Sequence, residues 1–173
     1  MVDQTSIPVI EQIARKIEAR LKTVDAGHGY LVTCAQVVRP SRRNQWAPAN
    51  GVTLLELDSF EDGEPETHAS GLKLTRTGVW TVRMFVEPSD DDDTPMDALY
   101  AVAIAELERA IAADFYLDAD DTFAGPGGYD GLGHNTELRA PQLVQDQNGT
   151  TTGVRVTVAI GYAHADNDPY TAL

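Results

Sequence analysis

The chain has 173 residues, of which 42% are hydrophobic, so it is long enough for one domain with a sizeable core. It carries 27 acidic and 13 basic residues, a net charge of -14, which argues against a protein that holds nucleic acid on a basic surface. The single cysteine, Cys34, rules out an internal disulfide and is expected to be a small core residue. No apolar run is long enough to cross a bilayer and no signal peptide is evident, so we expect folding in the cytoplasm and no membrane partner.

An amphipathic helix is predicted over Pro8 to Val24. Its apolar residues recur at steps of three and four and charged residues fill the other face; the apolar positions are Ile10, Ile13, Ala14, Ile17, Leu21 and Val24. Gly27 and Gly29 can supply the left-handed backbone that ends a helix. His28 between them is interpreted as a turn residue, with a ligand role as the alternative.

The segment from Tyr30 to Arg39 is rich in Val and Thr and is predicted to be a strand. Because apolar residues fall on both of its faces, we expect it to be central in a sheet. The polar loop Pro40 to Asn50 follows and contains a basic-aromatic cluster of Arg42, Arg43 and Trp46. This loop is either simply solvated or a contact site for an acidic partner, because Arg and Trp are common interface anchors.

Two extended segments are predicted next, Gly51 to Phe60 and Gly71 to Glu87, with an acidic turn at Glu61 to Glu66 between them. The second is expected to be bent or split at Gly78. Its later half alternates: Trp80, Val82, Met84 and Val86 on one side, and Thr81, Arg83, Phe85 and Glu87 on the other. We expect the first set to lie under a helix.

The stretch from Thr94 to Tyr116 predicts a long helix. Thr94 is a plausible N-cap, Pro95 suits the first helical position and Asp97 completes a capping-box pattern. The apolar stripe consists of Met96, Tyr100, Ala103, Ile104, Leu107, Ile111 and Phe115. The acids Asp90 to Asp93 lie at the positive end of the helix dipole. That position explains them without a metal, which is the alternative hypothesis.

The segment from Leu117 to Asn135 is predicted to be a long irregular loop. It fails the calcium-loop pattern because its sixth position is Phe123, and it lacks the Lys that follows a phosphate-binding glycine loop. It also follows a predicted helix, whereas a dinucleotide-binding loop follows a strand. We expect it to contact a partner, with Tyr129 as a candidate residue; calcium binding is the alternative.

Two further strands are predicted, Thr136 to Val144 and Val154 to Tyr162. Pro141 indicates that the first is an edge strand or has a bulge, and a hairpin turn is predicted at Gln147 to Thr150. The second alternates apolar residues with a small, mixed face that includes Arg155, our last candidate contact residue. A polar tail follows from His164.

These elements predict a single α+β domain over residues 1–173. The expected order is helix, three strands, helix, long loop and two strands. Such runs of neighbouring strands indicate a mostly antiparallel sheet of about five strands packed by two helices.

The layout resembles the tail terminator and tail completion proteins of long-tailed bacteriophages, the lambda-type family. The features that carry the resemblance are an N-terminal amphipathic helix leading into Gly29-Tyr30, a three-strand region, the Ala-rich helix Ala98 to Ala113, the Asp- and Gly-containing loop Asp118 to Gly133, and the terminal strand and tail Val154 to Tyr170. The resemblance covers nearly the full chain but is one of layout, without a specific motif.

The resemblance implies a structural virion protein with no cofactor and no enzymatic activity. Such proteins form a homo-oligomeric ring, usually of six subunits, on the head-proximal end of the tail tube. The expected partners are the tail tube protein and a neck or head-completion protein. DNA would pass through the lumen without sequence-specific binding, and acidic residues such as Asp90 to Asp93 or Asp118 to Asp121 would line it and repel phosphate.

Three alternatives remain open. The chain could be another head-tail connector, such as a stopper or adaptor, or a tail tube subunit. It could be an enzyme whose residues converge only in space, although His28, His68, His134 and His164 are scattered along the chain. It could also be a small-molecule or calcium-binding module that uses the Asp118 to Gly133 loop.

Overall fold

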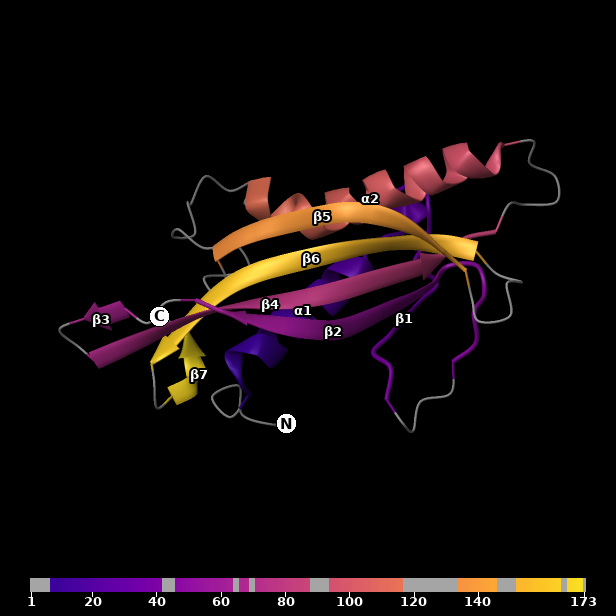
Figure 1. Ribbon diagram of the computed structural model, residues 1–173. Helices are drawn as coiled ribbons and strands as arrows, with labels where there is room; N and C mark the ends of the chain where they lie inside the picture. The colour runs from indigo at the N-terminus through magenta and orange to yellow at the C-terminus, as the bar shows by residue number, and fades with distance from the viewer. Residues whose placement is uncertain are drawn as a thin grey trace.

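The computed structural model describes residues 7–41, 46–63, 66–68, 71–87, 94–116, 134–145, 152–165 and 168–172. In these described residues, two α-helices pack on a twisted sheet (Figure 1). The elements are α1 (Val9–Leu21), the 3₁₀-helix η2 (Ala26–His28), β1 (Gln36–Val38), β2 (Val52–Asp62), β3 (Glu66–His68), β4 (Gly71–Phe85), α2 (Met96–Tyr116), β5 (His134–Gln145), β6 (Thr152–Ala165) and β7 (Asp168–Ala172). Within the described residues, no helix is both long and apolar enough to cross a membrane.

The sheet has the strand order β1-β2-β4-β6-β5, with β3 added beside β4 and β7 beside β6. All pairs are antiparallel except β1 with β2. The predicted α+β class with a mostly antiparallel sheet is therefore confirmed. The two short strands β3 and β7 are additional to the predicted five. Glu61 and Asp62, expected in an acidic turn, are the last residues of β2.

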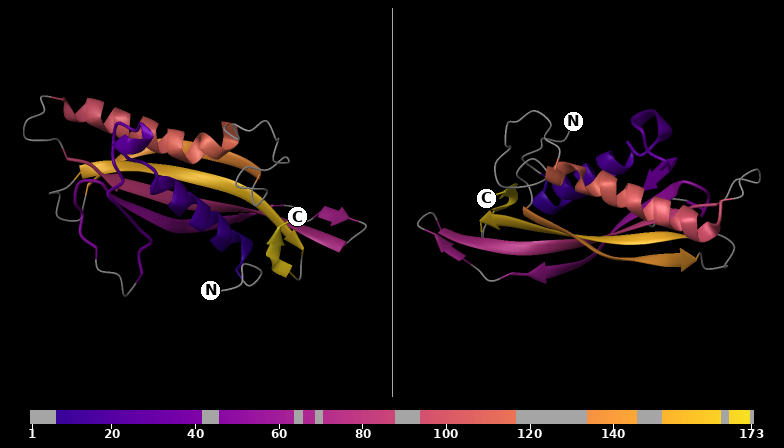
Figure 2. Two further views of the ribbon diagram at one scale, coloured as in Figure 1. Left: turned by 180° about the vertical axis from the view of Figure 1, so that it is seen from behind. Right: turned by 90° about the horizontal axis from the view of Figure 1, so that it is seen from above.

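Both helices lie on one face of the sheet, as the two views of Figure 2 show. Helix α2 lies over β6 and β5, and α1 lies beside it toward β2. The apolar sets predicted for β4 and β6 face these helices and form one core. Its largest fully buried members are Trp80, Ile13, Ile17, Leu21, Met84, Leu107, Ile111 and Ile160.

Strand β4 is not split at Gly78, because it pairs continuously on both sides from Arg76 to Met84. A Cβ at Gly78 would lie 2.4 Å from the Trp80 ring and 2.8 Å from Ile10 of α1. The glycine therefore makes room for an indole that packs between strand and helix.

Helix α2 buries much of the predicted stripe, with Ala103, Leu107 and Ile111 at most 1% exposed. The carbonyl of Pro95 accepts the amide of Leu99 at 3.1 Å, so the helix begins about where its capping pattern predicted. Tyr100 donates its hydroxyl to Thr152 Oγ1 at 2.5 Å, which fixes the first turns of α2 over the start of β6.

Helix α1 ends at Leu21, three residues earlier than predicted. The Thr23 hydroxyl donates to the carbonyl of Arg20 and turns the chain there, while Val24 still enters the core with 0% exposure. The left-handed Gly29 (φ 76°) ends the 3₁₀-helix η2 and not α1. Asp25 caps η2 by accepting the backbone amide of His28, whose ring Nδ1 also lies 2.9 Å from the Asp25 carboxylate. That contact fits the interpretation of His28 as a turn residue.

The prediction of a central strand over Tyr30 to Arg39 is wrong. Only Gln36–Val38 form a strand, β1, and it lies at the edge of the sheet. The apolar residues on both faces have another cause. Val32 and Cys34 belong to an irregular segment and are buried in the core beneath the helices. The Cys34 backbone amide donates to the carbonyl of Val24 at 2.8 Å and holds this segment in place. Cys34 is a core residue, as expected, and burial raises the pKa of its thiol.

The predicted strand Thr136 to Val144 is confirmed as β5. It is the last strand in the order, and its register with β6 shifts between Arg139 and Gln142, on either side of Pro141. Both meanings of that proline, an edge position and a bulge, therefore apply. The turn expected at Gln147 to Thr150 and the acids Asp90 to Asp93 lie outside the described residues.

Candidate interaction surface

The sheet face opposite α1 and α2, called here the open face, is the candidate functional surface. The second set of alternating residues on β4 and β6 faces this way, because cross-strand partners share a face. No helix among the described residues covers it (Figure 2). From one end to the other it consists of an aromatic cluster, an arginine pair, and an ion pair that spans the sheet.

The aromatic cluster lies at the end of the open face nearest β1. Four buried side chains form a second small core there: Val38, Val52, Leu54 and Phe85. The Trp46 ring stacks on Phe85 with a centroid separation of 6.2 Å, and Trp46 is still 37% exposed. The end of the loop preceding β2 therefore folds back over this cluster and leaves an indole edge at the surface.

Next to Phe85, the sheet places two arginines directly opposite each other. Arg83 of β4 and Arg155 of β6 are cross-strand partners, an arrangement that is unfavourable for like charges. Arg83 forms an ion pair with Glu56 of β2, and Arg155 Nη2 donates to the amide oxygen of Gln142 on β5. Burial, together with the charge of Arg155, lowers the pKa of Arg83.

The hydrogen-bond donors of this arginine pair do not all have acceptors among the described residues. Nε of Arg83 and Nε of Arg155 are both buried without a hydrogen-bond partner among the described residues. Glu56 is the single carboxylate that pairs with either guanidinium within that part of the chain, and Arg155 has an amide where Arg83 has an acid. Two positive charges therefore share one negative charge near the middle of the face.

Farther along, Arg139 of β5 reaches across the sheet to Glu61 of β2. Its two terminal nitrogens donate to the two carboxylate oxygens at 2.8 and 3.1 Å, and Glu137 lies 3.7 Å away. This hydrogen bonding lowers the pKa of Glu61. Val79 and Ala159, in the row between them, are 3% and 1% exposed. The ion pair therefore covers the small residues of the two central strands.

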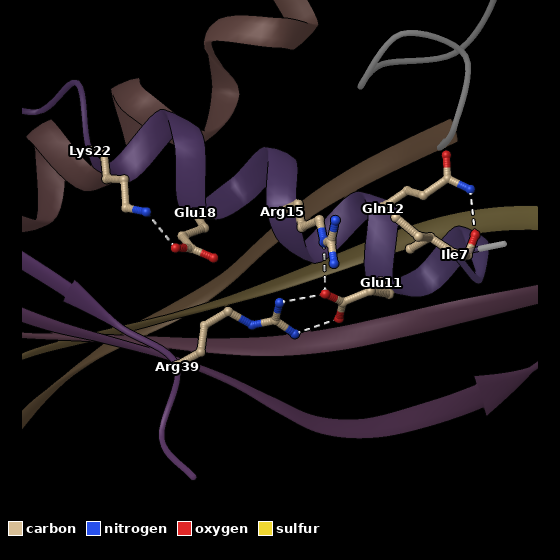
Figure 3. A network of polar contacts seen from close by, with 7 residues as sticks. All are labelled: Ile7, Glu11, Gln12, Arg15, Glu18, Lys22 and Arg39. Atoms are coloured by element: carbon tan, nitrogen blue, oxygen red, sulfur yellow. Dashed lines mark hydrogen bonds and ion pairs between the residues drawn. The ribbon is translucent and has the colours of Figure 1, made fainter. Parts of the chain in front are cut away.

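A second ionic cluster holds the edge of the sheet to helix α1 on the other side (Figure 3). Arg39, the residue after β1, donates to both carboxylate oxygens of Glu11 at 2.8 and 2.6 Å, and Arg15 donates to the same carboxylate at 3.0 Å. These donors, Arg39 first, hold the pKa of Glu11 at about 2 despite partial burial. The clamp fixes the point where the chain leaves β1 toward Trp46.

Of the five residues predicted as contacts, two lie in the described part of the chain. Trp46 and Arg155 are distant in sequence, and the structure places both on the open face. Trp46 stacks on Phe85, and Arg155 lies opposite Arg83. Phe85 and Arg83 are two residues apart on β4 and therefore point to the same face. Arg42, Arg43 and Tyr129 lie outside the described residues, as does most of the Leu117 to Asn135 loop, whose last two residues belong to β5.

Sequence reasoning missed four residues of this surface as contributors: Arg83, Glu56, Gln142 and Arg139. The alternation placed Arg83 on the polar side of its strand, but its pairing with Arg155 depends on the register of two strands about seventy residues apart. No local signal in the sequence sets that register.

One shallow cavity of about 250 Å³ lies away from the open face, at the start of α2. Its lining is Leu31, Val32, Thr33, Ala35, Asn50, Gly51, Met84, Val86, Glu87 and Leu99. Among the described residues, no group of three or more His, Cys, Asp and Glu side chains is placed to hold a metal ion. The strongest described surface feature is therefore the open face.

No protein-family model matches the sequence, and no curated protein matches it either.

Proposed function

We propose that this chain is a structural subunit that assembles into a ring and caps the head-proximal end of a phage tail tube, as tail terminator proteins do. The observation that carries the proposal is the open face of the sheet. It combines a partly exposed tryptophan with an arginine that lacks a carboxylate partner among the described residues, and Trp and Arg are the residue types that most often anchor protein interfaces.

The architecture supports assembly in a second way. A sheet with helices on one face has an open face and edges, and the main strand path in the described residues ends at β1 and β5. Exposed edges are common sites of contact between chains. Edges on opposite sides of one sheet suit a head-to-tail contact, which closes into a ring when the rotation between subunits permits. The layout resemblance to the terminator family points to the same kind of assembly.

Binding to purified tail tubes tests the proposal. Tubes lacking their terminator are incubated with the full chain and inspected by negative-stain electron microscopy. The proposal expects density at one end of each tube and no further growth when free tube protein is added. Long tubes formed by this chain alone would instead identify a tube subunit. Absence of binding at either tube end would contradict the proposal.

A stopper or adaptor role is separated by the same preparation. A terminator binds the tube directly, whereas a stopper or adaptor requires a head or neck component before it joins. Binding to neck complexes but not to bare tubes would therefore replace the terminator role with a connector role. The expected partners, a tube protein and a neck or head-completion protein, are tested in one series.

A further inference from the structure

We propose that the Arg83–Arg155 pair is a receptor for a carboxylate from a second copy of this chain. This inference rests on the proposed function in one respect, the assembly of the chain with itself. It names the site and the chemistry of the contact: a carboxylate that enters between two guanidinium groups on the open face.

The two arginines have less negative charge and fewer hydrogen-bond acceptors around them than their guanidinium groups can use. Arg83 is 34% exposed and shares its charge with Glu56, while Arg155 bonds to the neutral Gln142. Both Nε groups are buried without a partner among the described residues. A carboxylate is the natural ligand for such a pair, because each of its oxygens can accept from a different guanidinium. It would also remove the repulsion between two like charges that the sheet register forces together.

The surroundings favour a protein carboxylate over a nucleic-acid phosphate. Glu56, Glu61 and Glu137 lie on the same face as the arginine pair, on β2 and β5. These three acids balance the three arginines of the face, Arg83, Arg139 and Arg155, so a polyanion laid along the whole face gains little net attraction. A single acidic side chain can instead enter between Arg83 and Arg155, where Glu56 is the one carboxylate nearby and is already paired with Arg83. The partly exposed Trp46 beside the pair supplies the apolar contact typical of a protein interface.

The net charge favours a second copy as the partner. A chain with charge -14 repels its own copies, so contact requires a place where a copy's negative surface meets positive charge. The chain also supplies the ligand: Asp58, Glu87 and Asp97 are exposed and make no ion pair within the described part of the chain. The arginine pair cannot face its own counterpart across a two-fold axis, since four guanidinium groups would then converge. The carboxylate therefore comes from another part of the neighbouring copy.

The substitution Gln142→Glu tests the proposal without removing an arginine. It places a carboxylate where the amide now accepts from Arg155, so the receptor is filled from within its own chain. We expect the folded monomer to be as stable as the wild type or more stable, and self-association to weaken by at least roughly tenfold in dissociation constant. Ala19→Glu, at an exposed residue of α1 on the other side of the sheet, adds the same charge elsewhere and is expected to change association by less than about twofold.

Charge reversal at Arg155 is an independent test of the proposed carboxylate contact. Arg155→Glu should abolish assembly, while Arg76→Glu, on the helix-side face of the same sheet near its other end, should not. Both are measured by analytical ultracentrifugation over a concentration series, with thermal unfolding as the check of folding. Short duplex DNA is added in a separate series at physiological salt.

Four outcomes overturn the proposal. Assembly of Gln142→Glu that is equal to wild type shows that the pair receives no partner carboxylate, and the proposed function then stands without this contact. A wild type that stays monomeric at all concentrations, and that binds tail tubes no better than Arg155→Glu does, excludes a second copy as the partner of the pair; the capping of the tube then stands without this contact. DNA binding that Arg155→Glu abolishes identifies a phosphate site. A wild type that neither self-associates nor binds tubes contradicts both proposals.

Discussion

The two faces of the sheet differ in what their side chains contact: apolar side chains of the helices on one face, and a few charged or polar partners on the other. Along β4, Trp80 is 1% exposed under α1, whereas Arg83, three residues on, points to the open face with a side chain 34% exposed. The helix-side face is closed inside the chain by apolar packing, although the Trp80 indole Nε1 is buried there without a hydrogen-bond partner among the described residues. The open face is satisfied in part, by pairs that leave charge and hydrogen-bonding groups without partners in the described chain. The first face accounts for stability, and the second is available for contact.

The largest expected effect tests the helix-side face. Ile17 of α1 is 0% exposed within the main core, so Ile17→Ala should cost about 2–5 kcal/mol of unfolding free energy, measured by urea denaturation. Leu31→Ala is the control, because Leu31 is 78% exposed and its truncation should change stability by less than about 0.5 kcal/mol. Equal effects of the two substitutions would mean that α1 does not pack on this sheet as described.

A smaller effect is expected at the aromatic end of the open face. Trp46→Ala removes the ring stacked on Phe85 and should cost about 1–2 kcal/mol, since a third of the indole is already exposed. Trp46→Phe keeps a ring at that position and should recover most of the loss. Unchanged stability of Trp46→Ala would show that the loop does not cover this cluster. Unchanged ring assembly would show that Trp46 is not a contact residue.

The smallest expected effect concerns the clamp between α1 and the edge of the sheet. The pKa of Glu11 is about 2, against 4.5 for a free Glu, so its contribution to stability is complete above about pH 4.5 and is lost as the pH falls toward 2. Because the pair is partly exposed and screened, the contribution is about 1 kcal/mol. Urea unfolding between pH 2.5 and 6 should therefore show a steeper acid-side loss for wild type than for Glu11→Gln. Parallel curves would contradict the clamp.

Much of the fold could be predicted because each element carries its own periodicity. The stripe Ala103, Leu107 and Ile111 and the alternation of β4 and β6 are local patterns, and local burial followed them. The prediction of a central strand over Tyr30 to Arg39 was wrong because apolar residues on both sides of an extended chain also fit an irregular segment buried under helices. Strands β3 and β7 were missed because they are short, with three and five residues.

The candidate site was less predictable for a different reason. Arg155 and Trp46 could be selected singly by residue type, but their placement on one face required the register of the sheet. The partners Glu56 and Gln142 have no distinguishing local context in the sequence. Contacts across strands separated by tens of residues are set by the whole sheet, so sequence patterns alone name the candidates and not their pairing.

The mass of the wild-type chain in solution tests the claim of self-assembly most directly. Light scattering over a concentration series, with magnesium present and absent, gives that mass without any substitution. The proposal predicts a discrete species near six subunits that dissociates on dilution. A monomer at every concentration and in both buffers would contradict assembly of the chain with itself through its open face.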